Sequence, residues 1–173
     1  MSYVLPAADR FPYGVTVGDP TGTRELGRRV AGLLGGGEIL LLHGALGAGK
    51  TCFCQGVCTA LEVREDVVSP TFTLVNTYDG RLRIHHLDFY RVAAGDSLAD
   101  IGVPDLLDEV FDKDAVALVE WPGPLLPALA DEPIIELLVE TGADPHERIW
   151  HLRGRPEPSA AWLDLFTAKD APC

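Results

Sequence analysis

The order of apolar and polar positions along the chain predicts alternating strands and helices. Residues 38–43 form an apolar run typical of a buried strand, and 51–61 contain no proline and fit a helix. Upstream, 13–17 fit a short strand. Apolar residues at helical spacing follow Thr23, the expected N-cap, as far as the glycines at 35–37. This order favours an α/β domain.

The second half of the chain adds a hairpin and further strands. The β-prone runs 71–78 and 82–88 are joined through an Asp-Gly dipeptide, which is typical of hairpin turns, so we expect a mixed sheet. Residues 96–111 predict short helical pieces broken by Gly102 and Pro104. Three more apolar runs predict strands, and a last segment predicts a closing helix: 115–119, 134–140, 149–152 and 159–167.

The segment between the first buried strand and its helix carries the strongest chemical signal. Residues 44–51 read Gly-Ala-Leu-Gly-Ala-Gly-Lys-Thr and fit G-x-x-x-x-G-K-[ST], the P-loop that wraps phosphates with backbone N–H groups. In this motif Lys50 reaches the β- and γ-phosphates of a nucleotide and the Thr51 hydroxyl ligates Mg²⁺. We therefore predict binding of ATP or ADP with Mg²⁺ through one group of residues: Gly44, Leu46, Gly47, Ala48, Gly49, Lys50, Thr51 and Cys52.

Length and motif together define the expected fold. The 173 residues suit one domain with a substantial core, and we find no internal repeat or linker. The prediction is a single P-loop NTPase-like domain over 1–173, a three-layer α/β fold with a mixed, mainly parallel sheet that includes one antiparallel hairpin. Residues 1–12 and 168–173 are predicted to be a short extension and a tail prone to disorder.

Net charge and cysteine content limit the ligands and the cellular location that we expect for the protein. The net charge of −12 argues against tight direct binding of a nucleic acid, because Lys and Arg neutralise phosphates in such complexes. The chain has no apolar run of about 18 residues and no signal-peptide pattern, so we expect a cytoplasmic protein without membrane contact. Cys52 and Cys54 point to opposite sides of the predicted helix. The cysteines at 52, 54 and 58 could therefore not share one metal ion.

Two acidic residues could complete the Mg²⁺ site that a P-loop needs. Glu120 ends an apolar strand, where a Walker-B acid belongs, although a solvated acid at a strand end is the alternative. Asp88 ends the second hairpin strand and could instead cap a turn or pair with Arg91. His85 and His86 are neighbours on this strand, so they face opposite sides of the sheet.

Two further residues are candidates for contact with the nucleotide. Thr71 follows a proline between the P-loop helix and the hairpin. It could sense Mg²⁺ or the γ-phosphate as switch segments do, or it could simply begin a strand. Trp121, directly after Glu120, could be a packing residue or a flat surface beside the nucleotide.

Taken together, these motifs resemble the TsaE (YjeE) family of bacterial P-loop ATPases. The resemblance runs from about Thr23 to Pro122 and rests on matching segments in the family's order and spacing: Thr23–Gly27, Leu46–Thr51, Ser69–Phe72, Leu74–Val75, His86–Arg91, Gly102 and Glu120–Pro122. The P-loop alone fits many families. Its combination with Ser-Pro-Thr-Phe, His-x-Asp-x-Tyr-Arg and Glu-Trp-Pro is specific.

The resemblance implies a function and partners. It implies a Mg²⁺-dependent ATPase with little activity alone, which supports turnover of TsaD-like and TsaB-like subunits. The TsaD subunit transfers a threonylcarbamoyl group to an adenosine beside the tRNA anticodon, so this chain would meet tRNA only indirectly. Carried over by motif, Lys50, Asp88 and Glu120 are catalytic, and Thr51, Asp88 and Glu120 hold the metal. Four residues would lie near the nucleotide: Asp19, Thr23, Thr71 and Trp121.

Two departures from the family pattern and two alternative functions stay open. Ala45 stands where the family usually has Asp, and Cys52 stands where it tends to have a second Thr; neither change removes a phosphate-binding amide. A small-molecule kinase would need a lid rich in Arg, and only Arg81, Arg83 and Arg91 fall near the hairpin. A non-catalytic module would bind nucleotide only to assemble a complex.

Overall fold

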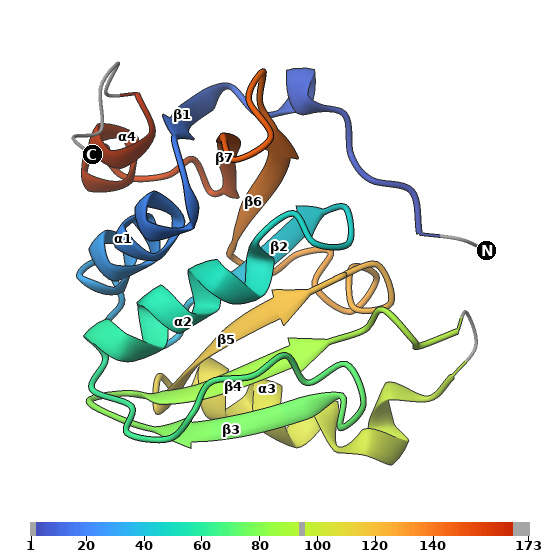
Figure 1. The fold of residues 1–173 in the computed structure, drawn as a ribbon. Coiled ribbons are helices and arrows are strands. Elements are labelled where there is room, and N and C mark those ends of the chain that lie inside the picture. The colour runs from blue at the N-terminus through green and yellow to red at the C-terminus, as the bar shows by residue number, and fades with distance from the viewer. Residues whose placement is uncertain (1–2, 94–95, 168–173) are drawn as a thin grey trace.

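A seven-stranded sheet with helices on both faces organises the protein (Figure 1). The computed structural model describes residues 3–93 and 96–167. Its strands are β1 (Tyr13–Val17), β2 (Ile39–Gly44), β3 (Val75–Asp79), β4 (Arg83–Asp88), β5 (Ala115–Glu120), β6 (Ile134–Thr141) and β7 (Arg148–Arg155). Its helices are α1 (Pro20–Ala31), α2 (Lys50–Ala60), α3 (Val103–Phe111) and α4 (Ala160–Phe166), with 3₁₀ turns η1 (Ala8–Arg10) and η2 (Leu98–Ile101).

The strand order is β1-β7-β6-β2-β5-β4-β3, and the four strands β6, β2, β5 and β4 run parallel to one another. The β3–β4 pair is the predicted antiparallel hairpin, and the mixed three-layer α/β fold is confirmed. At the opposite edge, β7 pairs antiparallel with both β6 and β1. The sequence predicts these strands but not their direction.

Burial on both faces explains why the central strands read as continuous apolar runs. Every residue of β2 and of β5 is buried. Leu40 and Leu42 pack into the core beneath α1, α2 and α4, whereas Ile39 and Leu41 pack into the core beside α3. The alternation of β2 side chains therefore supplies both layers of the core.

Gly56 allows α2 to pack directly against α1. A Cβ at Gly56 would lie 2.1 Å from the carbonyl oxygen of Arg24, and a Cβ at Gly27 would lie 2.3 Å from that of Phe53. Helix propensity alone favours Gly56→Ala by about 1 kcal/mol. Because the contact is with backbone, we expect a net loss of ~1–3 kcal/mol in the free energy of unfolding, measured by urea titration. Gly18→Ala is the control, since a Cβ there meets nothing within 4 Å. A Gly56→Ala protein as stable as the parent would contradict this packing.

Three predicted boundaries are wrong. Helix α1 begins at Pro20 and its N-cap is Asp19, whose Oδ1 accepts from the Gly22 N–H at 2.8 Å; Thr23 is buried inside the helix and is not its cap. Strand β3 begins at Val75 instead of residue 71, because 71–73 form a turn. Pro104 does not break a helix, since it lies in the first turn of α3, where its missing N–H is harmless.

The amino-terminal segment packs against the sheet. Phe11 is buried, and the Tyr3 hydroxyl donates to Nδ1 of His43 on β2. Nε2 of His43 donates to Glu136 at 2.8 Å, and Arg153 adds two hydrogen bonds of 2.8 Å to the same carboxylate. These contacts attach Tyr3 and Phe11 of the predicted extension 1–12 to the domain, whereas Val4 is 83% exposed; residues 1–2 and the predicted tail 168–173 lie outside the described residues.

The Glu136 carboxylate makes the free energy of unfolding depend on pH in the acidic range. Burial raises its pKa, but the hydrogen bonds from His43 and Arg153 outweigh burial and lower the pKa from 4.5 to about 2. The stabilisation is therefore complete above pH 4.5 and is lost as pH falls toward 2, a change on the order of 3 kcal/mol. We expect the unfolding free energy of Glu136→Gln to change less with pH between 4.5 and 2 than that of the parent protein. Glu65→Gln, at an exposed position, should keep the pH dependence of the parent. A parent slope in Glu136→Gln would refute this account.

Candidate active site

A cavity of about 330 Å³ opens at the carboxyl ends of the parallel strands β2, β5 and β4. In open α/β sheets ligands bind at this end of the strands. Its lining comes from the P-loop, the turn before β3 and the residues at the ends of β4 and β5: Leu46, Gly47, Gly49, Lys50, Thr51, Cys52, Ser69, Thr71, Asp88, Tyr90, Glu120 and Trp121.

The P-loop holds Lys50 at the floor of this cavity. Gly49 adopts a left-handed conformation (φ 111°), which lets the loop turn sharply into α2. The buried ammonium of Lys50 donates to the carbonyl oxygens of Gly44 (2.8 Å) and Ala45 (3.0 Å), and it lies 4.4 Å from the centre of the Trp121 ring. Burial lowers the pKa of Lys50, and the nearby carboxylates of Glu120 and Asp88 oppose this shift.

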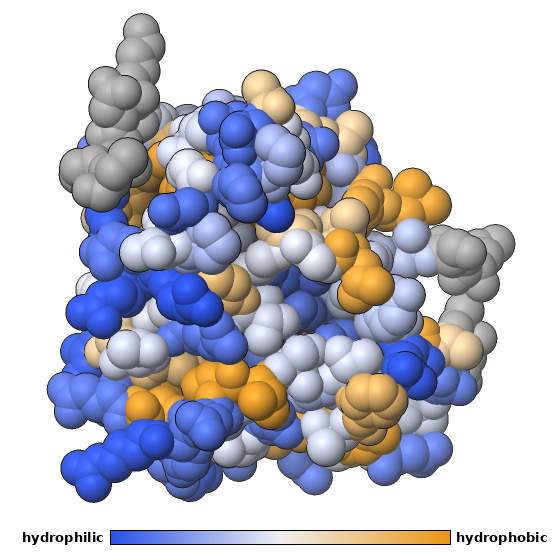
Figure 2. Space-filling model, in the orientation of Figure 1, coloured by the Kyte–Doolittle hydropathy of each residue, from blue (hydrophilic) through white to orange (hydrophobic). Residues whose placement is uncertain are grey.

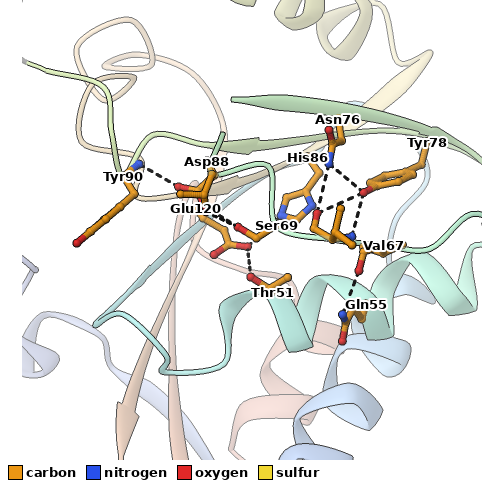
Figure 3. Close-up of polar contacts among 12 residues, drawn as sticks. Thr51, Gln55, Val67, Ser69, Asn76, Tyr78, His86, Asp88, Tyr90 and Glu120 are labelled. Atoms are coloured by element: carbon orange, nitrogen blue, oxygen red, sulfur yellow. Dashed lines mark hydrogen bonds and ion pairs between the residues drawn. The ribbon is translucent and has the colours of Figure 1, made fainter. Parts of the chain in front are cut away.

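Glu120 joins the start of α2 to the end of β5. The Thr51 hydroxyl donates to its Oε1 at 2.8 Å, and Nε2 of His86 lies 3.0 Å from the same oxygen (Figure 3). Glu120 is buried, so the alternative of a solvated acid at a strand end is wrong. Because a carboxylate only accepts, Nε2 of His86 carries the proton. Nδ1 is buried and has no hydrogen-bond partner among the described residues.

Asp88 organises the turn before β3. It pairs in register with Glu120 on the neighbouring strand and is buried. Its Oδ2 accepts from the hydroxyls of Ser69 (2.9 Å) and Thr71 (2.7 Å), and its Oδ1 accepts from the Tyr90 N–H at 2.9 Å (Figure 3). Pairing with Arg91 is not observed, because that guanidinium stacks on the Phe72 ring, 4.4 Å from its centre.

A second group of contacts fixes the approach to this turn. Gln55 on α2 donates to the carbonyl of Val67 at 3.0 Å, and the Val68 N–H donates to the Tyr78 hydroxyl at 3.2 Å. Asn76 donates to the carbonyl of Val68 at 3.3 Å (Figure 3). Thr71 is thus held toward Asp88 in a turn between α2 and β3, and it does not begin the strand.

The donors in the cavity fit a magnesium-bound phosphate chain. Thr51, Glu120 and Asp88 offer hydroxyl and carboxylate oxygens, the ligands that Mg²⁺ prefers. Lys50 and the amino terminus of α2 supply positive charge for phosphate. Thr51, Glu120 and Asp88 are therefore the residues that could hold the metal, and Lys50 with the loop amides could hold the nucleotide.

Comparison with known proteins places the chain in a family. The sequence model described as "Threonylcarbamoyl adenosine biosynthesis protein TsaE" matches residues 17–149. The chain belongs to the TsaE family. The resemblance stated from the motifs is confirmed, and it extends beyond them at both ends.

Relatives in the TsaE family cover much of the chain. A tRNA threonylcarbamoyladenosine biosynthesis protein TsaE from Bacillus subtilis is 36% identical over 130 residues, 75% of this chain and 78% of its own. One from Treponema pallidum is 41% identical over 99 residues, 57% of this chain and 70% of its own. A crystal structure of Bacillus subtilis YdiB superposes with a TM-score of 0.64 at 29% identity, covering 80% of this chain and 82% of that one.

Within this TsaE-family site, the cavity unites most of the predicted residues. Asp19, Thr23, Gly44 and Ala48 do not line it. Asp19 caps α1, the carbonyl oxygen of Gly44 accepts from Lys50, that of Ala48 accepts from Arg148 at 2.9 Å, and Thr23 lies beside Gly49. Two lining residues, Ser69 and Tyr90, are absent from the predicted set. Both stand inside quoted motifs, Ser-Pro-Thr-Phe and His-x-Asp-x-Tyr-Arg, and these motifs were the signal that could have found them.

Helix length bears on the membrane question. Across residues 3–93 and 96–167, no helix is both long and apolar enough to cross a bilayer.

Proposed function

We propose that this chain binds and hydrolyses ATP with Mg²⁺ as a component of the machinery that makes threonylcarbamoyladenosine in tRNA. It acts in the cytoplasm with TsaD-like and TsaB-like subunits, which hold the tRNA, and it is a weak ATPase until they stimulate it. One observation carries the proposal: the Thr51–Glu120 hydrogen bond of 2.8 Å, which brings the P-loop helix and an acidic strand end together beside Lys50.

The residues that line the cavity have different roles in the proposed transfer of the phosphoryl group to water. Lys50 exchanges its two carbonyl partners for phosphate oxygens and stabilises the charge that develops on them. Thr51 and Glu120 hold Mg²⁺, which when bound neutralises charge on the β- and γ-phosphates. Asp88 keeps Thr71 directed into the cavity, where its hydroxyl is placed to contact the terminal phosphate or the metal shell.

Exposed apolar side chains around the cavity support a partner-dependent enzyme. Leu46 and Tyr90 line the cavity and are exposed, and Phe72, next to Thr71, is 82% exposed. Figure 2 shows apolar groups on the side toward which the central strands point. Such residues at the mouth of a site are typical of a surface that another protein covers. A covering subunit would exclude water and stimulate hydrolysis.

The arginine positions favour an ATPase over the small-molecule kinase. Among the described residues, no Arg lines the cavity, and Arg83 is engaged with Asp79 (3.0 Å) and Glu109 (3.4 Å). The test is reconstitution with TsaD-like and TsaB-like subunits, tRNA and ATP. Inorganic phosphate released in step with modified adenosine supports the proposal. A phosphorylated metabolite would support the kinase, and modification sustained equally by ADP or a non-hydrolysable analogue would support the non-catalytic module.

A further inference from the structure

Three buried side chains with different metal-binding atoms meet behind the proposed magnesium site. The thiol of Cys54, the imidazole of His86 and the carboxylate of Glu120 each offer a ligand atom, and these atoms lie within 4.8 Å of one another. They come from α2, β4 and β5, so the fold brings them together from distant parts of the sequence. Cys54 stands three residues after Thr51, which places both on the same side of α2.

The cluster has the charge balance that a buried divalent cation requires. One thiolate, one carboxylate and one neutral imidazole carry two negative charges, which match a doubly charged ion. His86 holds its Nε2 3.0 Å from Glu120, and its Nδ1 has no partner among the described residues, so the ring proton can move to Nδ1 and leave the Nε2 lone pair for the metal ion. Burial keeps Cys54 protonated by raising its pKa, so an incoming metal ion must displace that proton to the solvent.

We propose that Cys54, His86 and Glu120 form a binding site for a zinc-like transition-metal ion, separate in chemistry from the Mg²⁺ site at Thr51. Thiolate and imidazole select Zn²⁺ and its neighbours, whereas Mg²⁺ prefers oxygen ligands alone. Ligand atoms of a tetrahedral zinc ion lie about 3.4 Å apart, so small side-chain movements would close this cluster around it. Three protein ligands leave the fourth position for water.

Glu120 belongs to both sites, and this couples them. Its Oε1 accepts from Thr51 and faces His86, so a metal bound with Cys54 and His86 draws the carboxylate away from the P-loop. Zinc and Mg²⁺–ATP therefore compete, and zinc inhibits hydrolysis. This consequence rests on the proposed function, whereas metal binding by the cluster does not.

Titration of the full chain with Co²⁺ tests the site without nucleotide. Cobalt takes zinc-like sites, and a cobalt–thiolate bond gives an intense near-ultraviolet absorption band. We expect one equivalent of Co²⁺ to produce this band in the parent protein and no such band in Cys54→Ala. Cys58→Ala is the matched control, because Cys58 is buried one turn further along α2 and lies outside the cluster, so its band should persist.

A second variant and a folding check distinguish loss of the metal ligand from loss of the fold. Cys54→Ser keeps the size and polarity of the side chain, and circular dichroism confirms that each variant is folded. Affinity for Co²⁺ should fall at least about tenfold in this variant, since even outer-shell partners of a metal are worth ~10–100-fold. A parent protein without the band, or an undiminished band in both Cys54 variants, overturns the proposal. Mg²⁺–ATP should weaken the band in the parent, and a failure of ATP binding alone would leave the cobalt result intact.

Discussion

Replacing Lys50 by alanine is expected to abolish ATP-dependent support of tRNA threonylcarbamoyladenosine formation. The ammonium is buried at the cavity floor, and its two present partners are carbonyl oxygens that phosphate oxygens can replace. No other Lys lines the cavity among the described residues, so the loss cannot be made up locally. Removing one preorganised charge of this kind costs on the order of 10²–10³-fold in rate, and ATP affinity should fall as well.

Calorimetric titration with ATP and reconstituted phosphate release measure this effect. Lys113→Ala is the matched control, because it removes the same charge from the exposed turn before β5. Circular dichroism shows whether the Lys50→Ala protein folds, since two carbonyl groups lose their donor. A folded Lys50→Ala protein that sustains full modification would refute the assignment of the P-loop as the site of ATP hydrolysis.

The elements predicted from sequence were those whose signal is local. The P-loop and its flanking strand and helix lie within 39–60, and every residue of β2 is buried, as its apolar run indicates. At the far edge only one pairing of β7 is long-range, because β1 reaches it from the other end of the chain, whereas β6 meets it as a hairpin closed by residues 142–147. That short connection is a local signal for antiparallel pairing, although we predicted only the two strands from the sequence and did not draw their direction from it.

The same distinction between local and long-range signals applies to the residues of the site. Glu120 could be predicted because an acid at the end of a buried strand is a local pattern. Ser69 has a weaker signal: it stands within the Ser-Pro-Thr-Phe motif, but its contact is with Asp88, which lies 19 residues away on another element. The first residues of the predicted strand 71–78 form a turn for the same reason: the Thr71 hydroxyl bonds Asp88 at 2.7 Å, and this contact overrides β-propensity.

His86 illustrates a role that only packing reveals. From sequence, His85 and His86 face opposite sides of β4, and this is confirmed: His85 contacts Glu109 at 3.1 Å, and His86 contacts Glu120 at 3.0 Å. The sequence also indicated that the cysteines on α2 could not converge on one ion. What it did not indicate is that one of them meets His86 and Glu120, because that meeting requires the sheet to be assembled.

These two histidine–glutamate pairs provide a matched test of Glu120, the second residue whose change should have a large effect. Glu120→Gln preserves the size of the side chain, and its amide oxygen can still accept from Thr51. The variant loses the negative charge that faces the proposed metal. We expect ATP still to bind, while phosphate release in the reconstituted complex falls by about 10²-fold or more.

Glu109→Gln changes the equivalent partner of His85 on the opposite face of the sheet, so it should leave hydrolysis at the parent rate. Comparing the two variants separates two explanations for a loss of phosphate release in Glu120→Gln. If the histidine–glutamate contact served only to stabilise β4, both variants would unfold more easily and lose activity in parallel. If Glu120 holds the metal, only Glu120→Gln loses turnover, and raising the Mg²⁺ concentration restores part of it. Equal rates of phosphate release in Glu120→Gln and Glu109→Gln would show that hydrolysis does not need the Glu120 carboxylate. That result would contradict the proposed metal site.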